Sequence, residues 1–245
     1  MVGVGLPTSP GGGGDSGENP GAGGESSSKT VSLTGNVQLL FDNGRFDTGE
    51  LLTDAATIKS TRADGRPTSD TWTGTPPFTV EDLPAQTTVW LLVTPQTAGA
   101  DAAVTLEPVV TGGANAKGFV TADLGVVRES TIDTIFDLLS VPLQRDTRAA
   151  QVVLLLRARG AGSGLTPRAG VTVKATSAGG ISYGASGSYS DVATATDATG
   201  VAVLLNVPAG GWPGSLVSVQ FSGAKSGGAE VRAIGGAVSL VTVVL

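Results

Sequence analysis

The sequence contains no histidine and no cysteine, and this double absence excludes several classes of chemistry. Without histidine there is no base for a Ser-His-Asp triad, and without cysteine there is no Cys-His nucleophile and no disulfide framework. Zinc sites built from these residues are excluded for the same reason. Serine is abundant, but no lysine stands near one in a recognisable Ser-Lys signature. We therefore expect a protein that is not an enzyme and needs no cofactor.

Runs of basic residues are also absent, and the net charge is −6. A protein without a lysine- or arginine-rich stretch has little attraction for a phosphate backbone, so nucleic acid is not an expected partner. The charge is unevenly spread. Residues 29–127 carry 6 basic and 11 acidic side chains, about −5, whereas residues 151–245 carry 6 and 3, about +3. This pattern allows two independently solvated surfaces, or domains or copies of the chain that associate through complementary fields.

Long apolar runs are scarce too, which argues against a transmembrane segment. The longest uncharged stretch at the C-terminal end has 13 residues, from Ala233 to Leu245, which is too short for a membrane helix. Its valines and threonine favour a core strand instead. Elsewhere the chain is rich in glycine, with 37 residues, and in Val, Leu, Thr and Ser, and this composition favours β structure.

Short apolar segments bounded by Gly, Pro or Asp recur along the chain with little helical pattern between them. This spacing predicts antiparallel β-sandwiches rather than βαβ units. We expect an all-β protein with two antiparallel sandwich domains (Ig-like or transthyretin-like), at 29–127 and 150–245. The predicted strands are 31–41, 55–61, 78–83, 89–94, 104–110 and 119–127 in the first domain and 152–160, 170–174, 201–205, 215–221, 230–234 and 237–245 in the second.

One helix is predicted, in the linker at residues 128–149. In the segment 130–139, Ile132, Ile135 and Leu139 recur at helical spacing, and Ser130 with Asp133 forms a weak capping pair. We expect this apolar stripe to cover the open end of a sandwich or the junction between the domains.

Residues 1–28 are rich in Gly and Ser, contain no aromatic residue and include four consecutive glycines. Such a segment cannot bury enough surface to offset its ordering entropy, so we interpret it as a disordered leader. It lacks the basic start of a signal peptide. By analogy with exported bacterial proteins, in which such a tether follows a signal or a lipid-bearing cysteine, we expect a periplasmic, cell-surface or extracellular location.

The second domain contains a distinctive turn and strand, TDATGVAVLLNVPAGG, at residues 196–211. Together with the apolar strand before it and TPRAGVTVKATS at 166–177, it resembles the carboxypeptidase regulatory-like domains. That resemblance implies a transthyretin-like sandwich of about seven strands, an accessory role in an exported or surface protein, and no catalytic residues. The first domain is a degenerate match, and an immunoglobulin-like sandwich of another topology fits it almost as well.

Two sets of side chains are candidates for ligand binding. The segment 41–55 is rich in acidic residues, and Asp42, Asp47 and Glu50 could offer oxygen ligands to calcium, although their spacing does not match an EF-hand. Tyr183, Tyr189 and Trp212 lie in predicted loops and could form an exposed aromatic patch that stacks on sugar rings. The alternative for the acidic residues is that they only form turns. The alternative for the aromatic residues is that they pack at the edge of the fold.

We expect the protein to be a non-enzymatic, exported or surface-associated structural or adhesive protein, with protein partners or other copies of itself. A carbohydrate- or calcium-binding module and an accessory domain of a peptidase system are the alternatives.

Overall fold

The computed structural model describes residues 30–41, 44–112, 114–115, 117–160, 164–185, 187–223 and 226–245. It consists of β-strands and one short helix, so the predicted all-β class is confirmed. The strands of the first half are β1 (Thr30–Gly35), β2 (Val37–Leu40), β3 (Gly49–Leu51), β4 (Ala56–Thr61), β5 (Pro67–Trp72), β6 (Phe78–Pro84), β7 (Thr88–Pro95), β8 (Thr105–Val110), β9 (Phe119–Thr121) and β10 (Leu124–Val126). After α1 (Glu129–Asp137), the second half contains β11 (Ala150–Arg159), β12 (Leu165–Pro167), β13 (Thr172–Lys174), β14 (Gly180–Ala185), β15 (Ser188–Ser190), β16 (Val201–Val207), β17 (Ser215–Ser222), β18 (Gly227–Ala233) and β19 (Val238–Val244).

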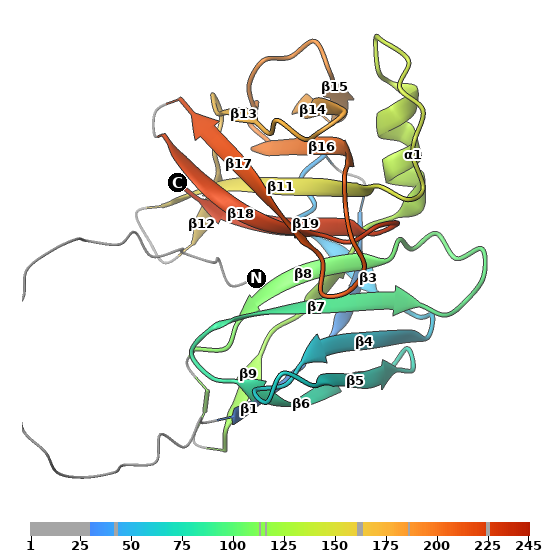
Figure 1. Ribbon diagram of the computed structural model, residues 1–245, viewed down its shortest axis with the longest axis vertical. Helices are drawn as coiled ribbons and strands as arrows, with labels where there is room; N and C mark the ends of the chain where they lie inside the picture. The colour runs from blue at the N-terminus through green and yellow to red at the C-terminus, as the bar shows by residue number, and fades with distance from the viewer. Residues whose placement is uncertain are drawn as a thin grey trace, which may run out of the picture.

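The first half is a sandwich of two sheets around an apolar core (Figure 1). One sheet has the order β6-β1-β9, and the other contains the adjacent strands β8, β7, β4 and β5. Alternate residues of each strand point inward, as in β4, where Ala56, Ile58 and Ser60 are buried. Leu33, Leu83 and Leu91 are fully buried in the core between the sheets.

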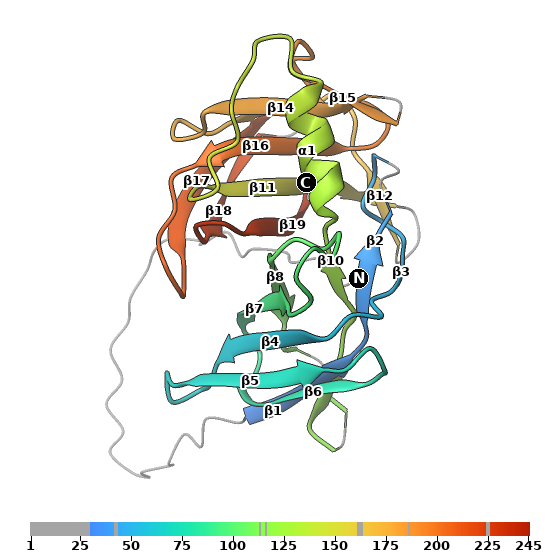
Figure 2. The ribbon, with the colours of Figure 1, turned by 90° about the vertical axis from the view of Figure 1, so that its right-hand side faces the viewer.

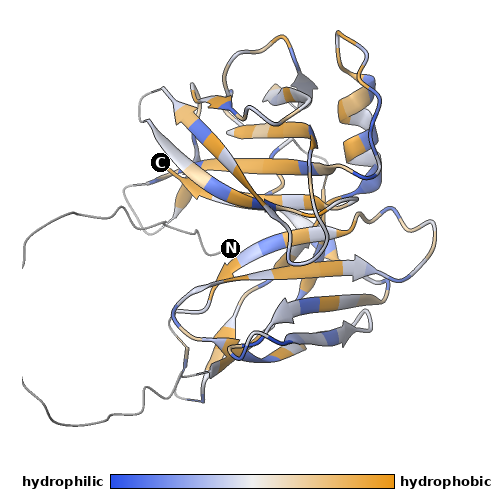
Figure 3. Ribbon diagram, in the orientation of Figure 1, coloured by the Kyte–Doolittle hydropathy of each residue, from blue (hydrophilic) through white to orange (hydrophobic). Residues whose placement is uncertain are grey.

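The second half has three layers. The middle layer contains β14, β16, β11 and β19, and one of its faces packs against the small sheet β13-β17-β18. Helix α1 lies across the other face (Figure 2), where Ile132 and Ile135 are fully buried. Because the middle strands are covered on both faces, they cannot alternate between apolar and polar residues. This explains the apolar runs of β11 and β16, which are coloured hydrophobic along most of their length in Figure 3.

The two halves share one sheet of ten strands. Its main path runs β15-β14-β16-β11-β19-β8-β7-β4-β5, with β12 added beside β11. The strand pair that crosses between the halves is β19–β8, in which Val238 pairs with Thr105 and Ser239 with Leu106 in parallel orientation. The predicted domain boundaries stay a prediction, because the sheet continues across them.

Parallel pairing is the feature of the sheets that the spacing of the segments did not predict. Besides β19–β8, the pairs β1–β9, β2–β10 and β11–β19 are parallel. Each joins strands that are distant in sequence. A prediction that pairs successive strands as hairpins does not include these pairs, because a parallel pair needs a long crossover connection.

Several boundaries also differ from those predicted. The predicted strand 31–41 breaks at Asn36 into β1, which belongs to the first-half sandwich, and β2, which pairs with β10 and β3. The glycine- and serine-rich stretch 177–191, predicted as a loop, forms β14 and β15. Strands β3, β5 and β12 were not predicted, because they are short or dominated by polar residues.

Candidate functional site

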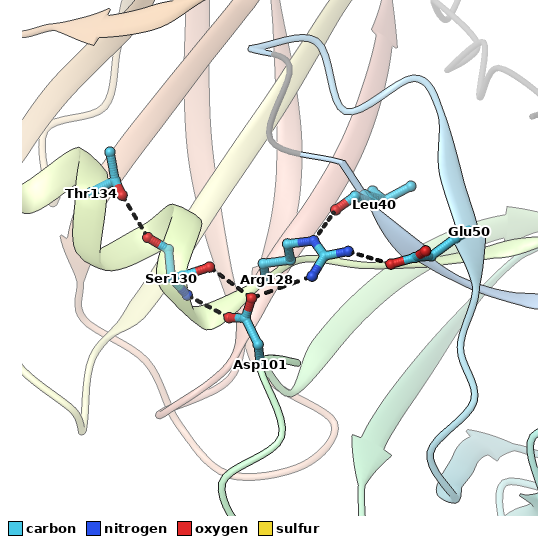
Figure 4. Close-up of polar contacts among 6 residues, drawn as sticks. All are labelled: Leu40, Glu50, Asp101, Arg128, Ser130 and Thr134. Atoms are coloured by element: carbon cyan, nitrogen blue, oxygen red, sulfur yellow. Dashed lines mark hydrogen bonds and ion pairs between the residues drawn. The ribbon is translucent and has the colours of Figure 1, made fainter.

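A cluster of polar contacts around Arg128 ties the first half to the start of α1 (Figure 4). The Arg128 guanidinium donates to Glu50 Oε1 at 2.6 Å, to the Leu40 carbonyl at 3.2 Å and to Asp101 Oδ2 at 3.4 Å. These three partners come from β3, β2 and the loop before β8. A planar guanidinium suits this role, because it presents several donors in fixed directions.

Asp101 also caps the helix from a distance. Its carboxylate accepts hydrogen bonds from the Ser130 backbone N–H and hydroxyl, both at 2.8 Å. Burial raises the pKa of Asp101, but these bonds and the charge of Arg128 outweigh it and hold the pKa below its ordinary value. The predicted pairing of Ser130 with Asp133 is therefore wrong, since Asp133 instead accepts from Arg145 at 2.8 Å. Asp101 lies 29 positions before Ser130 in the sequence, so local spacing could not identify it as the cap.

A second cationic contact between the halves is made by Arg157 of β11, whose residue surface is only 4% exposed. Its guanidinium donates to the Thr199 carbonyl at 3.0 Å and, from the other amino group, to the Arg45 carbonyl at 3.1 Å. Burial lowers the pKa of Arg157, and the charge of nearby Asp47 opposes this shift. Arg157 thus fastens the loop 44–48 of the first half to the turn before β16.

The acidic residues predicted for calcium occupy different surroundings. Asp42 lies outside the described residues. Asp47 is exposed and lies in the field of the buried Arg157 cation, and Glu50 is in the ion pair with Arg128. Within the part of the chain that the structure describes, no group of three or more acidic side chains could hold a metal ion. Calcium binding by Asp42, Asp47 and Glu50 stays a prediction.

The three aromatic residues predicted for sugar binding do not form one exposed patch. Tyr183 is buried, and its hydroxyl accepts from the Val173 N–H at 3.0 Å. Tyr189 is also buried, with its ring centroid 6.4 Å from that of Phe46. The Tyr183 ring lies in the second-half core, and the Tyr189 ring packs at the contact with the first half. Large amphipathic rings are often buried in this way when the hydroxyl finds a partner. Trp212 alone of the three is partly exposed, and it lies beside first-half residues.

Glu107 of β8 is a titratable group that the sequence analysis missed. Its Oε2 accepts a hydrogen bond from the Gly125 N–H of β10 at 2.7 Å. Burial raises the pKa of Glu107 to about 7, against the opposing effect of that bond, and Asp123 raises it further. A signal was present for Glu107, because it is the single charge in the otherwise uncharged strand β8. Arg157 follows seven uncharged residues of β11, but that strand ends at a second charge, Arg159.

No family model matches the chain, and none of the curated proteins matches it. Among solved structures, it is similar to the Bacillus anthracis TIE protein, with 13% identity, a TM-score of 0.26 and coverage of 88% of this chain and 33% of that one. It is similar to a fimbrial protein from Bacteroides ovatus, with 11% identity, a TM-score of 0.24 and coverage of 88% and 48%. It is also similar to the major pilin from Streptococcus pyogenes, with 9% identity, a TM-score of 0.21 and coverage of 88% and 99%. The chain spans less than half the length of the first two proteins, and the fold rests on the strand pairing described above. The resemblance to carboxypeptidase regulatory-like domains stays a prediction.

We predict that Arg157→Met lowers the free energy of unfolding by about 2–4 kcal/mol, because two carbonyls in the buried contact lose their donor. Arg157→Lys should also destabilise, since one ammonium cannot reach both carbonyls in the same geometry. Arg159→Met, an exposed position two residues further along β11, is the matched control and should change stability little. Urea unfolding measures all three variants, and an unchanged midpoint for Arg157→Met would contradict the role of this contact.

We predict that Glu107→Gln stabilises the protein at pH 8 but has much less effect at pH 5. The native state binds the Glu107 proton more tightly than the unfolded state, so its contribution is present at low pH and is lost as the pH rises through about 7. Glutamine does not titrate and keeps an oxygen for the Gly125 N–H. Melting temperatures across this range should show the variant gaining a few degrees over the parent as the pH rises. A difference that is constant with pH would show that Glu107 does not titrate there.

Proposed function

We propose that the protein is a non-enzymatic structural or adhesive protein, exported and surface-associated, that self-associates. The observation that carries this proposal is the way in which two halves of different charge are joined into one body.

The junction is held by backbone pairing, apolar packing and buried polar contacts together. Strands β8 and β19 are paired directly, and beside this pair Leu106 of the first half packs with Ile234 and Ala237 of the second. Arg128 and Arg157 add hydrogen bonds to first-half carbonyls at two further places. A junction with this many independent contacts resists bending and separation, which suits a protein that bears load at a surface.

The halves are stacked along the longest axis of the molecule (Figure 1), so the uneven charge becomes a separation of charge between its two ends. The first half, at about −5 over residues 29–127, lies at one end. The second half, at about +3 over residues 151–245, lies at the other end together with α1 and its linker, where residues 128–149 carry 3 basic and 4 acidic side chains, about −1. Opposite charges at opposite ends favour head-to-tail contact between copies. Such a heterologous contact continues into an open assembly unless its rotation closes a ring.

A structural role also fits the use that the fold makes of three charged side chains. Arg128, Arg157 and Asp101 join segments of the fold, and the bond from the Ser130 hydroxyl to Asp101 is part of the link to the start of α1. No helix among the described residues is long and apolar enough to span a membrane. The exported, surface location is supported by the composition of residues 1–28. An accessory role in a peptidase system depends on the carboxypeptidase regulatory-like resemblance alone.

We predict that the purified chain forms large species in light scattering at low salt and that high salt dissociates them, because salt screens contacts between exposed charges. Removing basic charge from the second half, with Arg159→Gln and Lys174→Gln, should weaken assembly. Arg66→Gln, an exposed change of the same kind in the acidic half, should leave assembly intact or strengthen it.

A monomer at both salt concentrations, measured from low to high micromolar protein, would contradict self-association. Equal weakening by changes in both halves would show that the attraction does not follow the separation of charge along the molecule.

A further inference from the structure

A groove lies between the two halves on the side of Trp212. Its volume is about 230 Å³, and residues from both halves line it. The first half contributes Ser60, Thr61, Arg62, Pro84, Thr88, Val89 and Trp90, and the second contributes Trp212, Pro213 and Arg232. Sites at the meeting of two structural units are a common location for ligands, because each unit can supply a different kind of contact.

The walls of the groove are partly aromatic. Trp90 of β7 and Trp212 are both partly exposed, and both pack against the cluster of Leu106, Ile234 and Ala237 behind them. Pro213 beside Trp212 is exposed. This packing fixes the position of the two indole rings, while part of each remains accessible from the groove. Rigid aromatic surfaces of this kind contact the apolar faces of ring-shaped ligands at little entropic cost.

The polar part of the groove is cationic. Arg62 and Arg232 line it, and Lys59 Nζ lies 5.0 Å from the centroid of the Trp212 ring. None of the described residues that line it is acidic, although the chain as a whole carries a net charge of −6. Two arginines in the lining, with a lysine against the Trp212 ring, in a protein with an excess of acid, indicate an anionic ligand.

The two arginines retain capacity for such a ligand. The Arg62 side chain is 41% exposed, and its ion pair with Asp82, made by Nη2, is long at 3.4 Å. Arg232 donates one hydrogen bond, at 3.3 Å, to the Pro213 carbonyl. A guanidinium has five N–H donors, so both can also donate to a carboxylate.

The backbone around the groove argues against an added peptide strand. In the ten-stranded sheet, β4 lies between β5 and β7, and β7 lies between β4 and β8, so both strands already have neighbours on each side. Recognition must then come from side chains: two indoles, a proline and the cations. These groups match a compact ring that carries a carboxylate, and the volume suits about one ring rather than a drug-sized molecule.

We propose that this groove binds an acidic sugar unit of a glycan, with the carboxylate on Arg62 and Arg232 and the sugar ring against Trp90 and Trp212. This activity is independent of self-association, because the groove belongs to a single copy of the chain. It differs from the aromatic patch predicted from sequence, since Trp212 shares the groove with Trp90, Arg62 and Arg232 and not with Tyr183 and Tyr189.

The test uses the full chain and trigalacturonate, with its methyl ester as the neutral counterpart, in isothermal titration calorimetry. We expect trigalacturonate to bind and the ester to bind far more weakly. Arg62→Gln and Trp212→Ala should each weaken binding by about tenfold or more, the scale of a lost charge-assisted contact or aromatic anchor. Arg66→Gln and Arg148→Gln remove the same charge at positions that do not line the groove and should leave binding unchanged. Melting temperatures confirm that each variant is folded.

Three results would overturn the proposal. The first is no binding of trigalacturonate at millimolar concentration. The second is equal loss in the groove and control variants, which would indicate diffuse electrostatic attraction. The third concerns an acidic peptide as occupant. Thr30 lies five residues after the segment 15–25, which contains three acidic residues, and lines a neighbouring hollow with Arg62. If a peptide of residues 15–25 binds with Arg62 dependence and trigalacturonate does not, the groove is a peptide site. Self-association at low salt can persist in any of these cases, so failure here leaves the proposed function standing.

Discussion

The structure depends on the burial of a sheet that is apolar on both faces. In β11 and β16 nearly every side chain is buried, and each such Val or Leu contributes about 1.5–3 kcal/mol when removed from water. One face is covered by β13, β17 and β18, which belong to the same half. The other needs α1 and, from the first half, Leu40 and Phe46. The second half therefore cannot cover its own core, and the union of the two halves follows from this requirement.

The polar contacts of the junction lie around this apolar contact and give it a defined geometry. Arg157 reaches across to the loop that carries Phe46, and Arg128 joins the start of α1 to the end of β2. Desolvation offsets much of the attraction between a cation and these carbonyls, but removing the buried Arg157 would leave the carbonyls without a donor, which is costly. The contacts of Arg157 and Arg128 favour one arrangement of the two halves, because other arrangements would not pair these side chains. The same close approach of the halves creates the groove between Trp90 and Trp212, so the constraint that joins the halves also supplies the proposed ligand site.

Local sequence patterns predicted the elements better than their connections. The turn at Asp197 and Gly200 was identified correctly, because Asp197 accepts from the Thr199 N–H at 2.7 Å and Gly200 has a φ of +64°. Helix α1 was found from its apolar spacing, within two residues at each end. In contrast, no local rule pairs β19 with β8 or Asp101 with Ser130, since these partners are distant in sequence. The positions of the aromatic candidates were equally out of reach of local patterns. Tyr183 and Tyr189 stand in a segment whose composition is that of a loop. Only tertiary packing shows that their rings are buried and that Trp212 lines one groove with Trp90.

The central claim is that the two halves form one body that unfolds together. Native-state hydrogen exchange at increasing urea concentration tests it most directly, by comparing the amides of β7, at the centre of the first half, with those of β11, at the centre of the second. The account predicts that the slowest amides of both strands exchange through the same opening, with the same free energy and the same dependence on urea. Exchange of β11 through a separate opening of lower free energy, while β7 stays protected, would contradict it.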